Sequence, residues 1–294
     1  MGGVAVIVFF SISGFLISRS GMRSDGFMDF MAKRARRIFP ALIPCSIFMY
    51  VIIGGMINNW NIQYIFSETT LKNILSVISL VPTIDDTITS GFKHAGLNGS
   101  LWTLPLEFAC YLIVGVSISL WKDSRVFLVV FLIMFGASIY YLLFPNMMLI
   151  FFIPTWLYPL RAMAFFFGAI LAVYYDRWDS TKAKCFIILA LSVLMYSSSR
   201  FSNEYTIIGY LLLSFVTISV CTSFNDIIVK GRFDYSYGVY IYAFPVQQVI
   251  INKTNLGFYP GMLISALSTI ILASLSWHFI EKKFIYRKKE KVLL

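Results

Sequence analysis

The sequence has 294 residues, of which 59% are hydrophobic and only 13% are charged, and its mean hydropathy is +0.78. A soluble domain carries roughly 25% charged residues, so this composition excludes a water-soluble globular protein and indicates an integral membrane protein. The net charge of +10 does not indicate a nucleic-acid-binding protein, because the basic residues stand in short clusters between apolar segments.

Spanning a bilayer takes about 20 mostly apolar residues in a helix. The apolar run 71–82 is too short to span comfortably, so we expect it to be re-entrant or to lie at the interface. Nine longer segments predict an all-α, polytopic bundle of transmembrane helices: 3–18, 38–56, 101–120, 125–143, 158–175, 184–198, 206–223, 236–252 and 260–279.

The basic residues predict an orientation for this bundle. Nineteen of the 24 Lys and Arg residues fall in the loops after the first, third, fifth and seventh segments and in the C-terminal tail. The alternate loops hold four. Because Lys and Arg are enriched in cytoplasmic loops, the C-terminus is predicted to be cytoplasmic and the loop 57–100 to face outward.

With nine spans and a cytoplasmic C-terminus, Met1 would lie on the outer side of the membrane. The sequence also opens inside an apolar helix, without a polar cap or a signal-peptide pattern. Either the first segment inserts with its N-terminus outside, or one helix is missing from the front. We favour the second explanation and expect residues 1–294 to form a single transmembrane domain that lacks this helix.

Cysteine spacing indicates neither a metal site nor a disulfide framework. Each cysteine stands within an apolar segment, where it is expected to pack as a small apolar side chain. These residues are Cys45, Cys110, Cys185 and Cys221.

Four basic residues, Lys33, Arg34, Arg36 and Arg37, stand directly before an apolar run that continues to Met56. One or two positive residues suffice to orient a helix. The excess indicates either contact with anionic lipid headgroups or a binding site for a phosphorylated cytoplasmic ligand, because Arg binds phosphate oxygens through two donors at once. The residues alone leave both interpretations open.

A second group of polar residues lies in the segment LNGSLWTLPLEFACY, residues 97–111. Its Asn-Gly-Ser sequence at 98–100 predicts a turn and an N-cap for the helix that follows. Ser100 and Trp102 are candidate substrate-binding residues, although Trp102 also fits an aromatic belt at the membrane interface.

Glu107 falls within the outer third of the same predicted helix. A carboxylate inside a membrane is costly and usually faces a cavity or a partner. We expect Glu107 to organise a site or to act in catalysis, or else to make a structural salt bridge, for example with Arg161.

The third group lies in DYSYGVYIYAFPVQQ, residues 234–248, which is rich in hydroxyl groups for the entry of a membrane helix. Ser236 and Tyr237 are candidate ligand-binding residues near the cytoplasmic face, while helix packing and interfacial anchoring are the alternative. Pro245 is expected to kink the helix and to free backbone carbonyl groups.

The sequence holds two histidines, and histidine is the usual general base near neutral pH. His278 is expected to make a structural hydrogen bond at the end of the last helix. His94 lies in the outer loop, where it is expected to be solvated.

The ordered set GVAVIVFFSISGFLI, KRARRIFPAL, NGSLWTLPLEFACY, SYGVYIYAFPVQQ and HFIEKKF resembles the acyltransferase-3 family of membrane O-acyltransferases, over essentially the whole chain. It is most similar to bacterial members that acetylate lipopolysaccharide O-antigen and other surface polysaccharides. The resemblance implies ten core helices in the bacterial inner membrane. It also implies acetyl-CoA as a donor substrate rather than a bound cofactor, and a sugar hydroxyl as the acceptor.

By this resemblance, Arg34 and Arg36 match the family's functional Arg-x-Arg pair and, with Arg37, would bind the phosphates and pantetheine of acetyl-CoA. Glu107 matches the glutamate after the WTL motif. Two further stretches match as well: Ser13, Gly14 and Phe15, and Ser236, Tyr237 and Gly238.

The sequence departs from the family at its front. The family's catalytic histidine lies near the end of a first helix, and this sequence has neither that helix nor that histidine. Some members also carry a histidine where Ala243 stands. The expected reaction is deprotonation of a sugar hydroxyl and its attack on a thioester, and an inactive truncated remnant is one alternative.

The other alternative is a transporter of a glycan or lipid carrier. Transporters of this kind usually show internal repeats with paired broken helices, and the two halves of this sequence show no convincing repeat. Dependence on acetyl-CoA distinguishes the two functions.

Overall fold

The computed structural model describes residues 2–81, 88, 90, 92, 96–121, 123–144, 148–150, 153–198, 205–224 and 229–286. Within these residues every element is helical except one antiparallel pairing of two-residue strands, β1 (Leu149–Ile150) and β2 (Ile153–Pro154). The prediction of an all-α bundle is confirmed.

The chain divides into two compact units. The first contains Met1–Met31 and Leu106–Ile227, and the second contains Ala32–Pro105 and Ile228–Leu294. The expectation of a single domain over residues 1–294 stays a prediction.

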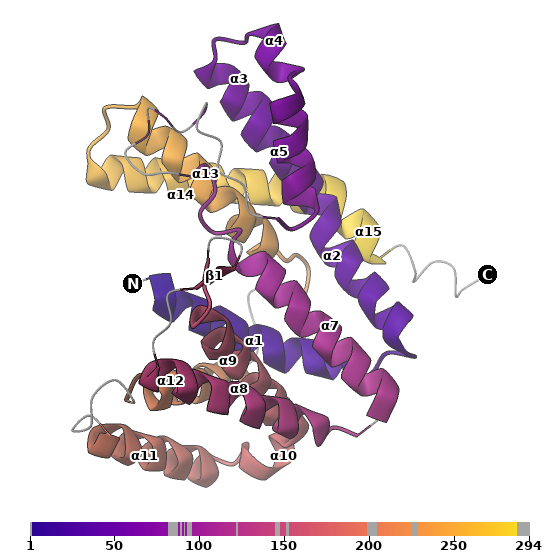
Figure 1. Cartoon of the computed structure of the whole chain (residues 1–294), viewed down its shortest axis with the longest axis vertical. Coiled ribbons are helices and arrows are strands. Elements are labelled where there is room, and N and C mark those ends of the chain that lie inside the picture. The colour runs from indigo at the N-terminus through magenta and orange to yellow at the C-terminus, as the bar shows by residue number, and fades with distance from the viewer. Residues whose placement is uncertain are drawn as a thin grey trace. The chain divides into compact units, whose positions relative to one another are not determined.

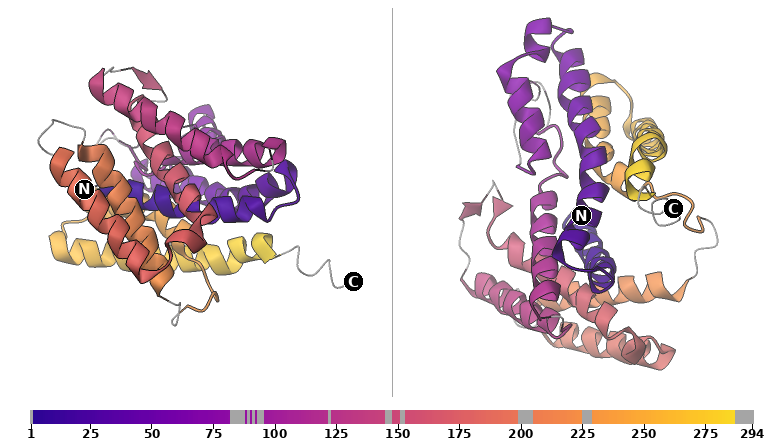
Figure 2. Two further views of the ribbon diagram at one scale, coloured as in Figure 1. Left: turned by 90° about the horizontal axis from the view of Figure 1, so that it is seen from below. Right: turned by 90° about the vertical axis from the view of Figure 1, so that its right-hand side faces the viewer.

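The first unit is built around α1, which packs against α9 and α12 (Figure 1). Helix α8 packs on α9, and α11 lies beside α12 (Figure 2). The bounds of these helices are α1 (Gly2–Met22), α8 (Val126–Leu143), α9 (Leu157–Val173), α10 (Tyr175–Trp178), α11 (Thr181–Ser198) and α12 (Tyr205–Ser223). The greater part of α7 (Thr103–Trp121) also belongs to this unit.

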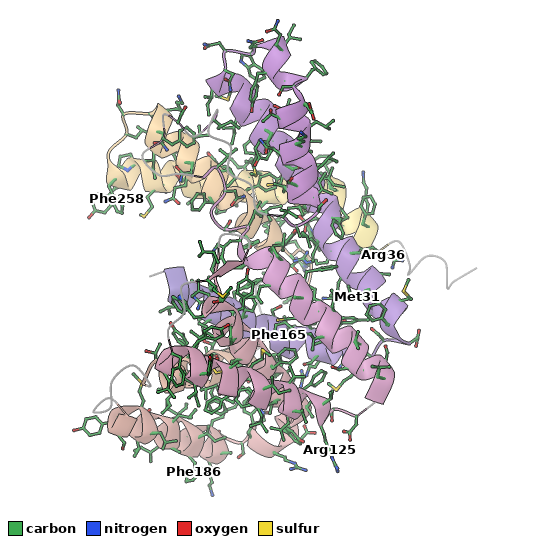
Figure 3. All side chains as sticks on the ribbon, viewed as in Figure 1. Met31, Arg36, Arg125, Phe165, Phe186 and Phe258 are labelled. Atoms are coloured by element: carbon green, nitrogen blue, oxygen red, sulfur yellow. The ribbon has the colours of Figure 1, made fainter. Side chains whose placement is uncertain are left out.

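Glycines allow α1 and α9 to approach closely. A Cβ atom at Gly14 would lie 1.8 Å from the carbonyl oxygen of Phe165, and one at Gly168 would lie 2.1 Å from that of Ser11. Small residues at such crossings are typical of membrane helices. Phe165 is fully buried at this crossing, whereas Phe186 on α11 is 71% exposed and points outward (Figure 3).

In the second unit, α13 packs against α14, and a Cβ atom at Gly238 would lie 2.8 Å from the Cα atom of Ala273. Most of α2 (Phe27–Ile47) belongs to this unit and continues through the π-helical turn η1 (Phe48–Ile53) into α3 (Gly54–Ile57). The other elements are α4 (Ile62–Ile65), α5 (Glu68–Ile78), α13 (Ser236–Lys253), α14 (Phe258–Ser276), the π-helical turn η3 (Trp277–Glu281) and α15 (Lys282–Tyr286).

Helices occupy the nine predicted spans, so the chain is a multi-pass membrane protein. Helices α11 and α13 cover the predicted spans 184–198 and 236–252, and Leu157–Val173 is a shorter apolar helix. Six helical stretches in the described part of the chain are long and apolar enough to cross a membrane: Gly3–Met22, Phe27–Ile57, Thr103–Leu120, Val126–Leu143, Thr206–Ser223 and Phe258–Ile285. The run 71–82 falls largely on α5, whose 11 residues are too few to span.

Candidate functional site

The carboxylate of Glu107 is buried inside the first unit, where only 5% of the residue is exposed. The Ser13 hydroxyl of α1 donates a hydrogen bond to its Oε1 atom at 2.9 Å. The Tyr111 hydroxyl, one helical turn further along α7, donates to the same oxygen and lies 3.4 Å from the Ser13 hydroxyl. Glu107 is thus held by a cluster of hydroxyl groups, as expected of a buried polar group.

This cluster lies within the membrane-spanning stretches, and Glu107 follows the start of α7 at Thr103 by four residues. Ser13 precedes the end of α1 at Met22 by nine residues, which is about 14 Å along a helix and roughly half the thickness of the hydrocarbon core. Sequence reasoning identified Glu107 and the stretch around Ser13 but missed Tyr111. Its spacing of four residues from Glu107 was the available signal, because such residues are neighbours on a helix surface.

A network of charges in the second unit is centred on Arg37. Its guanidinium group donates to Asp234 Oδ2 at 2.7 Å, to Glu281 Oε2 at 3.1 Å and to Ser236 Oγ at 3.2 Å. Glu281 is fully buried and also accepts a hydrogen bond from Ser276 at 2.9 Å. Arg37 therefore joins α2 to the start of α13 and to the π-helical turn η3.

Asp234 lies outside the membrane-spanning segments, just before α13. Burial raises the pKa of its carboxyl group, but hydrogen bonds from Ser236 and the positive charge of Arg37 lower it by more, so its pKa lies below its ordinary value. Asp234 is therefore ionised at neutral pH and remains paired with Arg37.

The other predicted donor-binding residues take different positions around this network. Tyr237 stacks on Tyr240 with ring centroids 6.3 Å apart, and the Arg37 guanidinium lies 5.7 Å from the Tyr237 centroid. Arg34 and Arg36 are both half-buried on α2. Because residues two apart do not face each other on a helix, their side chains leave α2 from different faces. Among the residues that the structure describes, Arg36 takes part in no ion pair.

The Asn-Gly-Ser turn binds to α13 where Pro245 interrupts the helical hydrogen bonds. Pro245 has no N–H group, so the carbonyl of Ile241, four residues earlier, has no helical donor. The side-chain amide of Asn98 donates to this carbonyl at 2.8 Å, and the Cys45 thiol lies 3.5 Å from it. The prediction that Pro245 frees a carbonyl group is confirmed.

Ser100 is fixed in the same turn. Its hydroxyl lies 2.6 Å from Asn98 Oδ1 and 3.2 Å from the Tyr240 carbonyl, and its own carbonyl accepts from the Tyr240 hydroxyl at 2.7 Å. Trp102 follows, half-buried, and α7 begins at Thr103. The predicted N-cap at 98–100 was therefore wrong by about three residues, because these side chains bind α13 instead.

The histidine of the last helix makes the structural contact that was expected. The Nε2 atom of His278 lies 2.9 Å from the hydroxyl of Tyr235, which also accepts a hydrogen bond from Ser274 at 3.3 Å. The other histidine, His94, lies outside the described residues. No group of side chains able to hold a metal ion occurs within the described ranges.

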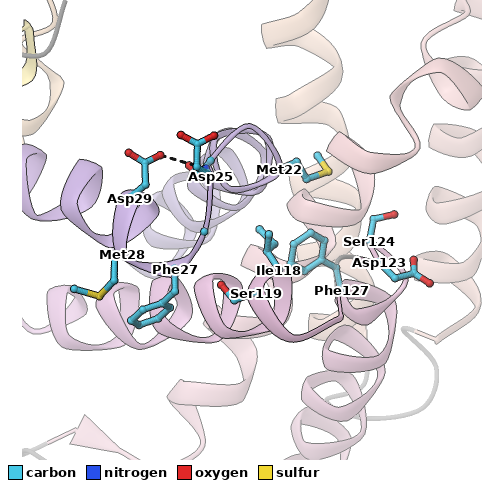
Figure 4. A pocket seen from close by; sticks show the side chains of 12 residues that line it. Met22, Asp25, Phe27, Met28, Asp29, Ile118, Ser119, Asp123, Ser124 and Phe127 are labelled. Carbon is cyan, nitrogen blue, oxygen red and sulfur yellow. Dashed lines mark hydrogen bonds between the residues drawn. The ribbon is translucent and has the colours of Figure 1, made fainter. Parts of the chain in front are cut away.

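A cavity of about 890 Å³ opens in the first unit beside the turn between α1 and α2 (Figure 4). Its lining combines the carboxylates of Asp25, Asp29 and Asp123 with apolar side chains such as Ile118 and Phe127. None of the predicted site residues lines it. The structure thus gathers Arg37, Ser236 and Tyr237 in one network, joins Ser100 to α13, and holds Glu107 in the first unit.

Comparison with known proteins gives matches along the whole chain. Residues 1–278 match the family described as acyltransferase domain. The chain is 51% identical to the O-acetyl transferase of Shigella phage Sf6 over 293 residues, which cover 100% of this chain and 88% of that protein. It is 25% identical to nodulation protein 10 of Rhizobium leguminosarum bv. viciae, over 94% of this chain and 80% of that protein. No solved structure matches the chain.

Proposed function

Because the chain belongs to the acyltransferase-3 family and is an acyltransferase, we propose that it transfers an acetyl group from acetyl-CoA to a hydroxyl of a cell-surface polysaccharide or lipid-linked glycan. The similarity to the phage O-acetyl transferase along the whole chain is the observation that supports this most. In the reaction a base removes the hydroxyl proton, the oxygen attacks the thioester carbonyl, and the thiolate of CoA leaves.

The donor is proposed to bind at the basic cluster of α2. Arg34 and Arg36 contact its phosphate groups, for which the planar guanidinium is suited. Arg37 already binds Asp234, Glu281 and Ser236. Its proposed role is therefore to hold α2 against the start of α13 beside the donor. Tyr237, stacked on Tyr240, would pack against the same ligand.

The acceptor is proposed to meet Ser100 and Trp102. Glu107, oriented by Ser13 and Tyr111, is proposed to organise the polar interior of the first unit for the reaction. His278 is engaged by Tyr235, so we assign the base to no described residue.

We place the protein in the bacterial cytoplasmic membrane with its C-terminus in the cytoplasm. Two considerations support this orientation: the charge bias of the loops and the supply of acyl-CoA on the side of the basic cluster. The acceptor is then modified from the outer side or within the membrane.

The test uses the full chain reconstituted in lipid nanodiscs with radiolabelled acetyl-CoA and lipopolysaccharide from an O-antigen-bearing strain. We expect release of free CoA thiol together with label on the polysaccharide, and loss of both when Arg34 and Arg36 are replaced by Ala. Movement of glycan without thiol release would overturn the proposal in favour of a transporter. Donor binding without thiol release would overturn it in favour of an inactive protein.

A further inference from the structure

Helix α5 buries two polar side chains and exposes two large apolar ones. The face packed inside the protein carries Thr70, Asn73 and Val77, two of which are polar, whereas Leu71 and Leu75 are 56% and 52% exposed. At 100° per residue the exposed surface of α5 has an apolar flank around Leu71 and Leu75 and a polar flank around Glu68 and Lys72. A helix facing water would bury its leucines and expose its polar residues, whereas α5 exposes Leu71 and Leu75 beside Glu68, Thr69 and Lys72 and buries Thr70 and Asn73.

The charged residues of α5 are confined to its first turns. Glu68 and Lys72 form an ion pair of 2.7 Å at its start, where Ser67 caps the helix through a 3.1 Å hydrogen bond from the Thr70 amide. The remainder of the helix, from Asn73 to Ile78, carries no charge. Charged side chains therefore occur only near the N-terminal end of α5.

Helix α5 packs along η1, inside the long helical stretch that ends with α3. Figure 1 shows α5 running back beside this stretch. Ile57 follows Arg37 by 20 residues, or about 30 Å of helix, which equals the thickness of the hydrocarbon core. With the basic cluster at one surface, η1 lies within the core, and the part of α5 that packs on η1 lies at the same depth.

The Asn-Gly-Ser turn supplies independent support. Asn98 contacts the Ile241 carbonyl and Met49, and the Cys45 thiol contacts the same carbonyl. Cys45 follows Arg37 by eight residues, or about 12 Å of helix. The predicted outer loop thus returns to membrane depth at its far end, and irregular backbone at that depth is tolerated where protein buries it.

We propose that α5 is a re-entrant helix, inserted into the bilayer beside η1 with its Leu71–Leu75 flank in contact with lipid acyl chains. The exposed side chains that lead into it, Trp60, Ile62 and Phe66, are 56%, 71% and 84% exposed. They lie in the interfacial layer, where aromatic residues are enriched. The ion pair of Glu68 and Lys72 stays at the headgroups.

We assign lipid to the exposed apolar surface of α5 because this surface is continuous with the lipid-facing surface of the spanning stretch that ends at Ile57. Met56, at the end of the spanning stretch, is 53% exposed and precedes Trp60 by one turn. The chain turns there through the left-handed residues Asn59 and Trp60, and the Trp60 amide closes the turn on the Gly55 carbonyl at 2.7 Å. The lipid-facing surface of the spanning stretch is therefore continuous with the exposed apolar surface of the segment that leads into α5.

The test replaces the exposed Cys185 and Cys221 by Ser and introduces single cysteines at Phe66, Leu71 and Leu75. Each is labelled with an environment-sensitive nitrobenzoxadiazole group, in vesicles of phosphatidylcholine and phosphatidylglycerol. Quenching is measured with lipids that carry a nitroxide at a shallow or a deep position, and with aqueous iodide. A label at Glu68 is the matched control for the headgroup level.

We expect the ratio of deep to shallow nitroxide quenching to increase from Phe66 through Leu71 to Leu75, with iodide reaching only the Glu68 label. Equal, shallow quenching at all sites would show a helix lying flat on the surface and would overturn the proposal. Quenching by iodide at the Leu75 label would show that α5 faces water, and this would overturn the proposal. Protection of the label from both nitroxide and iodide would show that a protein covers this surface, and this would overturn it as well. The measurement needs no turnover, so its failure leaves the proposed acyl transfer untouched.

Discussion

The side-chain amide of Asn98 donates a 2.8 Å hydrogen bond to the backbone carbonyl of Ile241. This is the carbonyl that Pro245 leaves without a donor in α13. A polar turn and a proline that are 147 positions apart in the sequence are therefore two halves of one contact, and it fixes Ser100 where the acceptor is proposed to bind.

Replacing Asn98 by Ala leaves this carbonyl with only the weak thiol donor of Cys45, at a cost of about 1–3 kcal/mol. We expect a lower melting temperature of the detergent-solubilised protein, measured by intrinsic fluorescence. Pro245→Ala restores an N–H group four residues after Ile241, so in that background Asn98→Ala should cost less. Equal costs in both backgrounds would show that the amide does not compensate for the proline.

Arg37 and Arg36 are neighbours in the sequence with different expected roles. Arg37→Ala leaves the buried Glu281 unpaired, and breaking a buried ion pair costs about 3–5 kcal/mol. Arg36 makes no ion pair within the described ranges, so Arg36→Ala should change stability by less than about 0.5 kcal/mol while weakening acetyl-CoA binding. Melting temperature and donor titration, measured on both variants, separate the roles. A destabilised Arg36→Ala protein would contradict this assignment.

The lowered pKa of Asp234 gives a prediction for acid stability. A carboxylate whose folded pKa lies below its unfolded value stabilises the fold above that unfolded value, about 3.9 for Asp. The stabilisation is lost as pH falls through the folded pKa. Asp234→Asn should therefore be less stable than the wild type at pH 7, and the difference should shrink below about pH 4. A difference in melting temperature that stays constant from pH 7 to 3 would show that the charge of Asp234 does not contribute to stability.

The hydroxyls around Glu107 are expected to act by orienting its carboxylate. Ser13→Ala and Tyr111→Phe each remove one donor to a charged group, worth about 1.5–3 kcal/mol, and should lower acetyl transfer about tenfold or more. Glu107→Gln keeps the shape of the side chain but not the charge, and should lower transfer further. The matched readout is acetyl-CoA affinity, which should stay unchanged in all three. Normal transfer by the Glu107→Gln protein would contradict a role in the site.

The crossing of α1 and α9 depends on glycine. Gly14→Ala places a methyl group against the Phe165 carbonyl, so the helices must separate, at a cost of about 1–3 kcal/mol. Gly136→Ala on α8 is the matched control, because nothing lies within 4 Å of its Cβ position and alanine there should stabilise the helix by about 0.5–1 kcal/mol. Opposite shifts in melting temperature are expected. Similar shifts would show that the crossing is not tightly packed.

Local patterns in the sequence predicted much of the fold. Apolar runs predicted helices at nine positions where the structure has them, and six helical stretches in the described part of the chain are long and apolar enough to cross a membrane. The shortness of the run 71–82 likewise predicted that α5 would not span. The carbonyl freed by Pro245 was predictable because proline lacks a donor whatever surrounds it.

Contacts between residues far apart in the chain could not be read in this way. Arg37 binds partners 197 and 244 positions away, and nothing local distinguishes it from Arg36 one residue before. Asn98 and Ser100 have the composition of a helix cap, yet their side chains bind α13, because an unsatisfied carbonyl there competes for them. The choice depends on tertiary packing that single-sequence patterns do not contain.

The close crossing at Gly14 also bears on biosynthesis. Phe165, its partner on α9, is encoded 151 residues later, an interval of about 8–30 s at bacterial rates of chain elongation. Helix α1 therefore enters the membrane well before α9 exists. During this interval the face of α1 that carries Gly14 lies in the membrane without its native neighbour. The packing of α1 against α9 therefore takes place after α1 has been inserted.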